Sequence, residues 1–115
     1  EAFNQSVSNF NTSKVTDMSG MFNCAYAFNQ SVSNFGTSKV TDMRYMFYRA
    51  YVFNQSVSNF NTSKVEHMDY MFFYAHAFNQ DLTGWNVDSV TSHYGFDDNS
   101  DNSALTADHL PNFKS

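Results

Sequence analysis

Residues 2–26 read AFNQSVSNFNTSKVTDMSGMFNCAY, and this stretch decides the fold because the chain repeats it almost unchanged. A second copy spans residues 27–51 and a third spans residues 52–76. A fourth copy begins at Ala77 and loses the pattern after Phe96. A repeat of this length is typical of proteins built from stacked units, since one unit alone cannot bury its own apolar face.

The second half of each copy carries a helical pattern. In the first copy Met18, Met21, Phe22 and Ala25 are spaced i, i+3, i+4 and i+7. That spacing places the four side chains on one side of a helix. Short polar residues just upstream could accept the free amides of its first turn. The sequence therefore predicts a short helix in each copy.

The first half of each copy predicts a short strand around Val7, where a β-branched residue and Phe10 lie among Ser and Asn. Because a strict strand would not bury both side chains on one face, we expect a turn near Asn9. One strand and one helix per unit is the plan of leucine-rich repeats. We therefore predict an α/β repeat solenoid, leucine-rich-repeat-like, with about four 25-residue coils over residues 1–96 and a C-terminal cap over residues 97–115.

Stacking such copies would place identical residues in columns. We expect one column of phenylalanines, one of methionines and one of asparagines. They are Phe3, Phe28, Phe53 and Phe78; Met18, Met43 and Met68; and Asn4, Asn29, Asn54 and Asn79. A stacked asparagine column is expected to satisfy backbone groups between copies. The alternative is glycosylation, because Asn4, Asn29 and Asn54, and also Asn11 and Asn61, fit the N-x-S sequon.

The repeat spelling F-N-Q-x-V-x-x-F/W-N-T-S-x-V-T-x-M-x-x-M-F-x-x-A resembles the repeat of BspA-like bacterial surface proteins, which are relatives of leucine-rich-repeat proteins. Residues 78–87, FNQDLTGWNV, are the closest to that family's commonest spelling, and residues 103–113 resemble the ending of its arrays. The resemblance covers nearly the whole chain. It implies a cell-surface or secreted location and a role in adhesion or surface recognition, and it brings no catalytic motif.

The net charge of −5 is unevenly distributed. Residues 1–80 hold five bases and five acids, whereas residues 81–115 hold six Asp and one Lys. The absence of a basic stripe argues against nucleic-acid binding. No apolar run approaches the length needed to span a bilayer, so we expect no membrane insertion. Cys24 is the one cysteine and cannot form an intrachain disulfide.

Comparison of the three good copies separates two kinds of position. Sixteen of the 25 columns are identical and nine differ, and eight of the nine fall in the window equivalent to residues 16–27. Inside that window only the apolar stripe is constant. In the second and third copies, the changed positions hold Arg44, Tyr45, Tyr48, Arg49, Tyr51, Asp69, Tyr70, Phe73, Tyr74 and His76.

We expect these ten residues to form a ligand-binding face, because exposed aromatic patches mark interaction sites and Tyr and Arg anchor interfaces. Drift at exposed positions is the alternative, but drift predicts change on every exposed surface. Six polar positions expected to be largely exposed do not change, namely those of Ser6, Ser8, Asn9, Thr12, Ser13 and Lys14. The sequence thus favours a non-catalytic recognition module for a protein or glycan ligand.

Other functions stay open at this point. The chain could be a structural spacer or a self-associating array in a larger adhesin, with a homo-oligomer formed through an uncapped N-terminal coil. The ladder of Thr12, Thr37 and Thr62 resembles that of ice-binding solenoids, although a lysine column runs beside it.

One loop has the spacing of a calcium site. Asp97, Asn99, Asp101 and Asp108 fall at positions 1, 3, 5 and 12 of a calcium-binding loop, but Asn102 replaces the turn glycine. The alternative is an acidic, solvated cap loop. The sequence shows no Ser-His-Asp order, no CxxC and no phosphate-binding loop, so we expect neither enzymatic activity nor a cofactor.

Overall fold

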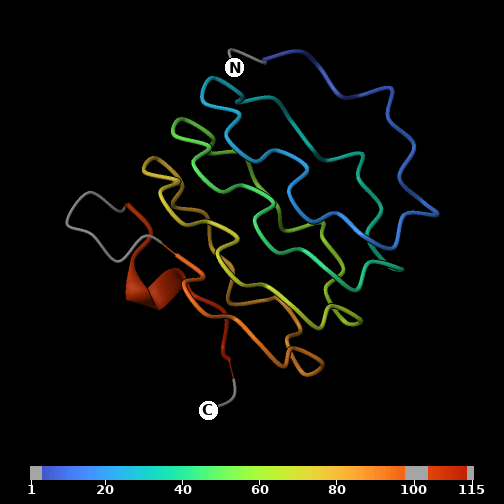
Figure 1. The fold of residues 1–115 in the computed structure, drawn as a ribbon, viewed down its shortest axis with the longest axis vertical. Coiled ribbons are helices and arrows are strands. Elements are labelled where there is room, and N and C mark those ends of the chain that lie inside the picture. Colours follow the sequence, from blue (N-terminus) through green and yellow to red (C-terminus); the bar gives the residue numbers. More distant parts are fainter. Residues whose placement is uncertain (1–3, 98–103, 114–115) are drawn as a thin grey trace.

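A computed structural model describes residues 4–97 and 104–113, which form a compact body of 37 × 36 × 19 Å. In these residues η1 (Ala107–His109), a single 3-10 turn, is the one helix, and pairing is limited to isolated β-bridges (Figure 1). The predicted α/β leucine-rich-repeat-like solenoid is therefore wrong. Neither the helix through Met18 nor the strand around Val7 is formed.

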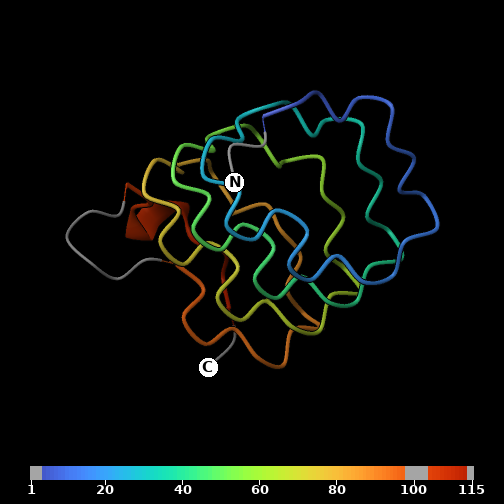
Figure 2. The ribbon, with the colours of Figure 1, turned by 45° about the horizontal axis from the view of Figure 1, so that its top comes forward.

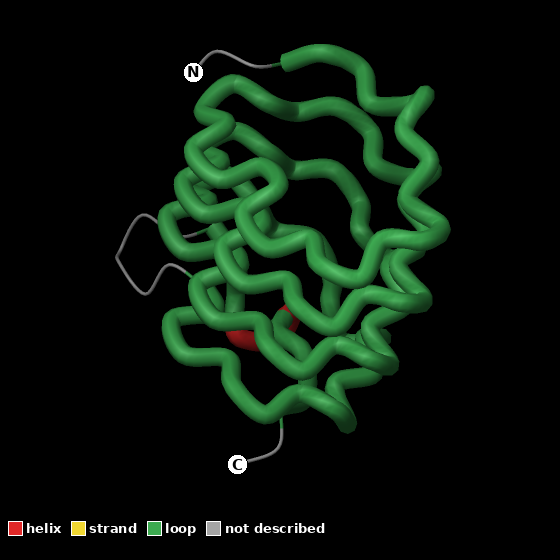
Figure 3. Tube along the Cα trace, turned by 45° about the vertical axis from the view of Figure 1, so that its right-hand side comes forward, coloured by secondary structure: helices red, strands yellow, loops and turns green. Residues whose placement is uncertain are grey.

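The copies nevertheless lie beside one another in register, as Figures 1 and 2 show for residues 4–97. Parallel bridges join Asp17 to Asp42, Asp42 to His67, and His67 to Ser92, and each step is one copy long. The chain therefore builds its body from irregular turns that repeat at the same place in every copy. Figure 3 shows this turn-rich path.

The backbone amides explain why the helical pattern forms no helix. The amide of Phe47 donates to the carbonyl of Met71 in the next copy, at 2.9 Å, and not to Met43 four residues before it. The amide of Ala50 closes a four-residue turn on the carbonyl of Phe47, at 3.0 Å. Amides used in these two ways cannot form the i to i−4 bonds of an α-helix.

Two successive turns imitate helical spacing. Residues 43–46 and 47–50 each form a turn closed between the first residue and the fourth. Met43, Met46, Phe47 and Ala50, the ends of these turns, are fully buried. Inward-facing residues at positions 1, 4, 5 and 8 are the i, i+3, i+4, i+7 pattern of an amphipathic helix. The buried stripe was thus predicted correctly except at Met21 of the first copy, which is exposed, and its secondary structure was not.

The turn expected near Asn9 is confirmed. The amide of Phe10 donates to the carbonyl of Val7 at 3.0 Å, and the second copy repeats this bond between Phe35 and Val32. In the second copy, this turn brings the side chains of both Val32 and Phe35 into the core.

The core consists of columns of identical or similar side chains. In the predicted phenylalanine column, Phe28 stacks on Phe53 with ring centroids 5.8 Å apart, and Phe53 stacks on Phe78 at 5.9 Å. Other buried columns are Val7, Val32, Val57 and Leu82; Phe22, Phe47 and Phe72; Met18, Met43 and Met68; and Phe35, Phe60 and Trp85. Burying one ring in each copy beside the next removes apolar surface from water and adds aromatic stacking.

A threonine ladder supports the backbone from inside. Thr12, Thr37 and Thr62 are buried, so the expectation that Thr12 is exposed is wrong. The hydroxyl of Thr37 donates to the carbonyl of Asn61 at 3.0 Å and accepts from the amide of Asn61 at 2.6 Å. Because the ladder is buried, it offers no flat outer face, and the ice-binding alternative loses its basis.

The asparagine column links the copies as predicted. The side-chain oxygen of Asn29 accepts from the backbone amide of Asn54 at 2.9 Å, and that of Asn54 accepts from Asn79 at 2.9 Å. Gln55 adds a side-chain bond to the same oxygen of Asn29 at 3.1 Å. Several unchanged polar columns therefore hold the copies together, which accounts for part of their constancy.

A second link between copies is made by different residues in different copies. Asn59 donates from its side-chain nitrogen to the carbonyl of Val32 at 3.2 Å. The fourth copy has Gly84 in that column, and there the indole Nε1 of Trp85 donates to the equivalent carbonyl, that of Val57, at 3.2 Å. The Asn-Phe pair of the third copy and the Gly-Trp pair of the fourth copy therefore both supply a donor to the same backbone carbonyl position.

The described part of the C-terminal cap packs Leu105 and Pro111 into the body. Thr106 precedes η1, but its hydroxyl donates to Asp108 and makes no helix-capping bond. Of the calcium candidates, Asn99 and Asp101 lie outside the described residues. Within residues 4–97 and 104–113, no three acidic, His or Cys side chains gather as a metal site.

The threonine ladder gives a test of the fold. In Thr37→Val the shape is kept, but both backbone groups of Asn61 lose their partner. A hydrogen bond contributes about 0.5–1.5 kcal/mol, so losing both should lower the free energy of unfolding in urea by about 1–3 kcal/mol. Ser38→Ala, at an exposed neighbour, is the control and should be neutral. Equal stability of the two variants would contradict the ladder.

Candidate ligand-binding face

The turns place bulky side chains in the left-handed backbone region. Tyr45 is the third residue of the turn 43–46 and Arg49 is the third residue of the turn 47–50, with φ of 61° and 60°. The equivalent positions in the other copies are also left-handed: Gly20, Cys24, Tyr70, Tyr74 and Gly95. Third turn positions with positive φ favour Gly or Asn. Here the bonds between copies hold larger residues in that conformation.

The predicted site residues form stacked columns. Tyr45 stacks on Tyr70 with centroids 5.2 Å apart, and Tyr48 stacks on Phe73 at 5.8 Å. A third column contains Tyr26, Tyr51 and His76, with separations of 4.9 and 5.3 Å. Each of these rings thus stacks on its counterpart in a neighbouring copy.

Contacts across the columns join them into one surface. Tyr48 lies edge-on to Tyr45 at 5.3 Å, and Phe73 contacts Tyr74 at 4.3 Å. The guanidinium of Arg49 lies over the rings of Tyr48 and Tyr74, at 5.5 and 5.3 Å. We call this surface the aromatic face and define it as Tyr45, Tyr48, Arg49, Tyr51, Tyr70, Phe73, Tyr74 and His76.

Most of the aromatic face is half-buried, because its rings cover one another. Tyr45 is its most open member, with 40% of its surface exposed. Sequence comparison missed two neighbours, Tyr26 and Tyr94, which are 37% and 76% exposed. Tyr26 shares a column with Tyr51, a signal that was available in the sequence. Tyr94 lies edge-on to Tyr70 at 5.6 Å. The equivalent residues in the other copies are Ser19, Arg44 and Asp69, so comparison of the copies does not predict an aromatic residue there.

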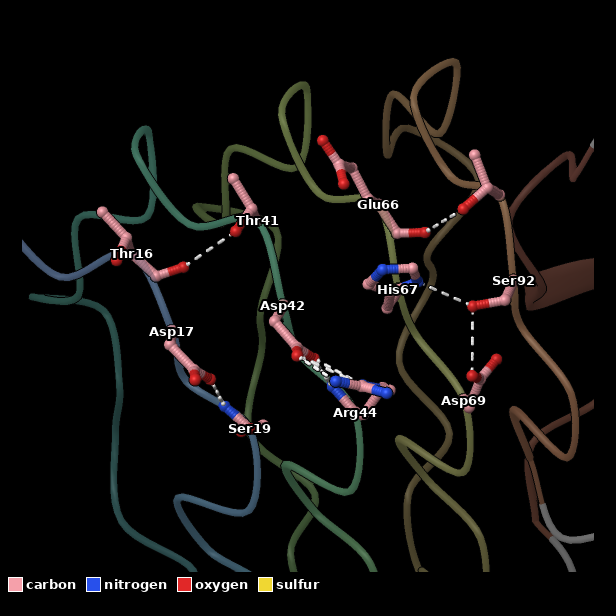
Figure 4. A network of polar contacts seen from close by, with 11 residues as sticks. Thr16, Asp17, Ser19, Thr41, Asp42, Arg44, Glu66, His67, Asp69 and Ser92 are labelled. Atoms are coloured by element: carbon pink, nitrogen blue, oxygen red, sulfur yellow. Dashed lines mark hydrogen bonds and ion pairs between the residues drawn. The ribbon is translucent and has the colours of Figure 1, made fainter.

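Arg44 and Asp69, the other two predicted residues, precede Tyr45 and Tyr70 in the chain. They lie in a network of polar contacts that we call the polar edge (Figure 4). Arg44 donates from its terminal nitrogen to Asp42 at 2.7 Å, and from Nε to both carboxylate oxygens at 3.1 Å. Partial burial raises the pKa of Asp42, but the hydrogen bonds and charge of Arg44 outweigh it. The pKa of Asp42 therefore lies below its ordinary value of 3.8.

The same edge brings Ser92 between His67 and Asp69, as Figure 4 shows. The hydroxyl of Ser92 donates to the carboxylate of Asp69 at 3.0 Å. Nδ1 of His67 lies 2.9 Å from the hydroxyl oxygen of Ser92. Since the serine proton goes to Asp69, His67 donates at Nδ1. In a hydrolytic triad the histidine stands in the middle and accepts from the serine. The order here is different, because the serine stands in the middle and donates to the carboxylate.

A cavity of about 220 Å³ lies between the fourth copy and the cap. Its lining includes His93, Phe96, Leu110 and Phe113. The ring of His93 stacks on Phe113 with centroids 3.9 Å apart. His93 occupies the column of the buried Met18, Met43 and Met68, and the cap packs Phe113 against its ring.

The chain is similar to one protein family. Residues 1–107 match the family model described as "Mycoplasma protein of unknown function, DUF285". The chain belongs to this family. Membership in the DUF285 family names no ligand and no site residue. Neither the search of curated proteins nor that of solved structures finds a match. In the part of the chain that the structure describes, no helix has the length and apolarity to cross a membrane.

We call the left-handed third positions of these turns corners. The corner at Cys24, which has φ of 61° and no aromatic ring, gives a test. A side chain in this conformation costs about 1–2 kcal/mol, a cost that glycine avoids. We expect Cys24→Gly to be more stable than Cys24→Ala by about 1 kcal/mol in urea unfolding. At Asn23, which lacks a positive φ, the order should reverse. The same order at both positions would contradict the left-handed corner.

The depressed pKa of Asp42 gives a pH test. Its stabilisation is fully present above the unfolded pKa and is lost as pH falls through the lower, folded pKa. The stability difference between wild type and Arg44→Gln should therefore be largest at neutral pH and shrink as pH falls below 3.8. Lys39→Gln, at an exposed lysine with no ion pair to a described residue, is the control. A difference that persists in acid would contradict the pairing.

Proposed function

We propose that this chain is a non-catalytic recognition module of a surface or secreted protein and binds its ligand through the aromatic face. One observation supports this most strongly: the second and third copies hold bulky side chains at left-handed corners. Tyr45 and Tyr70 have φ of 61° and 58°, where Gly20 and Gly95 show that glycine also fits.

The physical balance at these corners favours a role outside the fold. A left-handed side chain costs about 1–2 kcal/mol, and an aromatic pair returns about 0.5–1.5 kcal/mol. Because Tyr45 and Tyr70 are both left-handed, their stacking does not by itself offset the strain of the two residues, and it leaves Tyr45 40% exposed. Strained residues of this kind concentrate at functional sites. Exposed, rigid tyrosines offer contact area at a small entropy cost.

The resemblance of the repeat to BspA-like surface proteins supports the same proposal. It suggests adhesion or surface recognition, and it suggests a cell-surface or secreted location. The family match gives a name without a function, so the ligand class rests on the chemistry of the face. Aromatic rings with a few polar neighbours suit either a glycan or a protein loop.

The test compares wild type with Arg44→Ser/Tyr45→Ser/Tyr48→Ser on an array of glycans and surface proteins. The matched control is Ser38→Ala/Lys39→Ser, which changes two exposed residues of the same copy. Ligands of the wild type should bind the triple variant at least about tenfold more weakly and the control equally well. Unchanged binding by a folded triple variant would contradict the proposal.

The alternative is a structural spacer or self-associating array. Exposed apolar side chains on the first copy, Phe10 at 46% and Met21 at 37%, favour that alternative. Sedimentation at several protein concentrations separates the two, because only self-association makes the sedimenting mass depend on concentration.

A further inference from the structure

The aromatic face ends in an open position above Gly20. Gly20 has φ of 68°, the same left-handed backbone as Tyr45 and Tyr70 in its column. Among the described residues other than its two chain neighbours, a Cβ built at Gly20 would have one heavy atom within 4 Å, the Cβ of Asn23 at 3.9 Å. The backbone could thus carry a side chain at this corner, and its Cβ would meet no other described atom outside its chain neighbours.

The other end of the same column is closed. A Cβ at Gly95 would lie 2.6 Å from the ring of Tyr70, so that ring covers Gly95. Tyr45 stacks on Tyr70 with an angle of 16° between the ring planes. The bridges from Asp17 to Asp42 and from Asp42 to His67 place the second copy between the first and the third. The side of Tyr45 away from Tyr70 therefore faces the first copy, which holds Gly20.

The neighbours of this position are polar, and the one charged residue among residues 16–24 is the anion Asp17. Asn23 is exposed and occupies the column of Tyr48, whose ring lies edge-on to Tyr45. Residues 16–24 contain no cation, and Arg44 is bonded to Asp42. The side-chain oxygen of Asn23 accepts from the thiol of Cys24 at 3.2 Å, and its exposed NH₂ group can donate to a ligand. A flat ring beside such an amide suits the apolar C–H side of a sugar with hydroxyls at its rim. An anionic ligand would find no unpaired cation there.

We propose that a neutral hexopyranose ring of a glycan stacks on the free side of Tyr45, in the place that a side chain at position 20 would fill. Asn23 exchanges hydrogen bonds with its hydroxyls. The inference rests on the proposed function of the aromatic face and names its ligand class. The spacing of 5.2 Å between Tyr45 and Tyr70 shows that the column already accepts parallel rings in succession.

The test titrates cellotetraose and chitotetraose into the isotope-labelled chain and follows amide and ring signals by NMR. At least one of the two should shift the signals of Gly20, Asn23 and Tyr45. Gly20→Tyr fills the open position and should weaken binding at least about tenfold. Gly20→Asn tolerates the left-handed backbone without filling the position, so it should stay within about threefold of wild type.

A second pair of variants keeps the test decisive if Gly20→Tyr does not fold. Tyr45→Ser should lose binding, whereas Tyr94→Ser, which removes an exposed ring from the far side of Tyr70, should keep it. Absence of binding by wild type, or unchanged affinity in folded Gly20→Tyr, overturns the sugar site. If the array finds a protein ligand that Gly20→Tyr still binds, the aromatic face keeps its proposed function and the sugar site fails.

Discussion

Hydrogen bonding between copies is the interaction on which the rest of this structure depends. The amide of Arg49 reaches the carbonyl of Phe73 at 2.9 Å, and the amide of Tyr45 reaches that of Asp69 at 3.0 Å. Because these bonds keep the copies in register, each residue meets its counterpart in the next copy. Columns of phenylalanine, threonine and asparagine follow from that register, and so does the tolerance of left-handed side chains at the corners.

The register also separates what may vary from what must stay. A column can change residue type if its hydrogen bond is made in another way, as Trp85 does where Gly84 replaces asparagine. At the corners the backbone is held from both sides, so the outward side chain is free to be Gly, Cys, Arg or Tyr. The side chains of this surface can therefore differ between copies, because the hydrogen bonds between copies fix the backbone without them.

Much of the packing between copies could be predicted from the sequence, because aligning the copies shows which residues stack on one another. The columns, the buried stripe and the turn near Asn9 all follow from comparing copies. The secondary structure could not be predicted, since consecutive turns bury the same positions as a helix, and no local signal marks Tyr45 or Arg49 as left-handed. Of the predicted site, the aromatic residues come together, while Arg44 and Asp69 lie on the polar edge. The open position above Gly20 is visible only in three dimensions.

The most direct measurement is the coupling between nitrogen and carbonyl carbon across hydrogen bonds, observed by NMR in the isotope-labelled chain. The amide nitrogen of Phe47 should couple to the carbonyl carbon of Met71, in the next copy. Coupling of Phe47 to the carbonyl carbon of Met43 would show an α-helix in the second half of the copy, and it would contradict the register from which the fold and the aromatic face are derived.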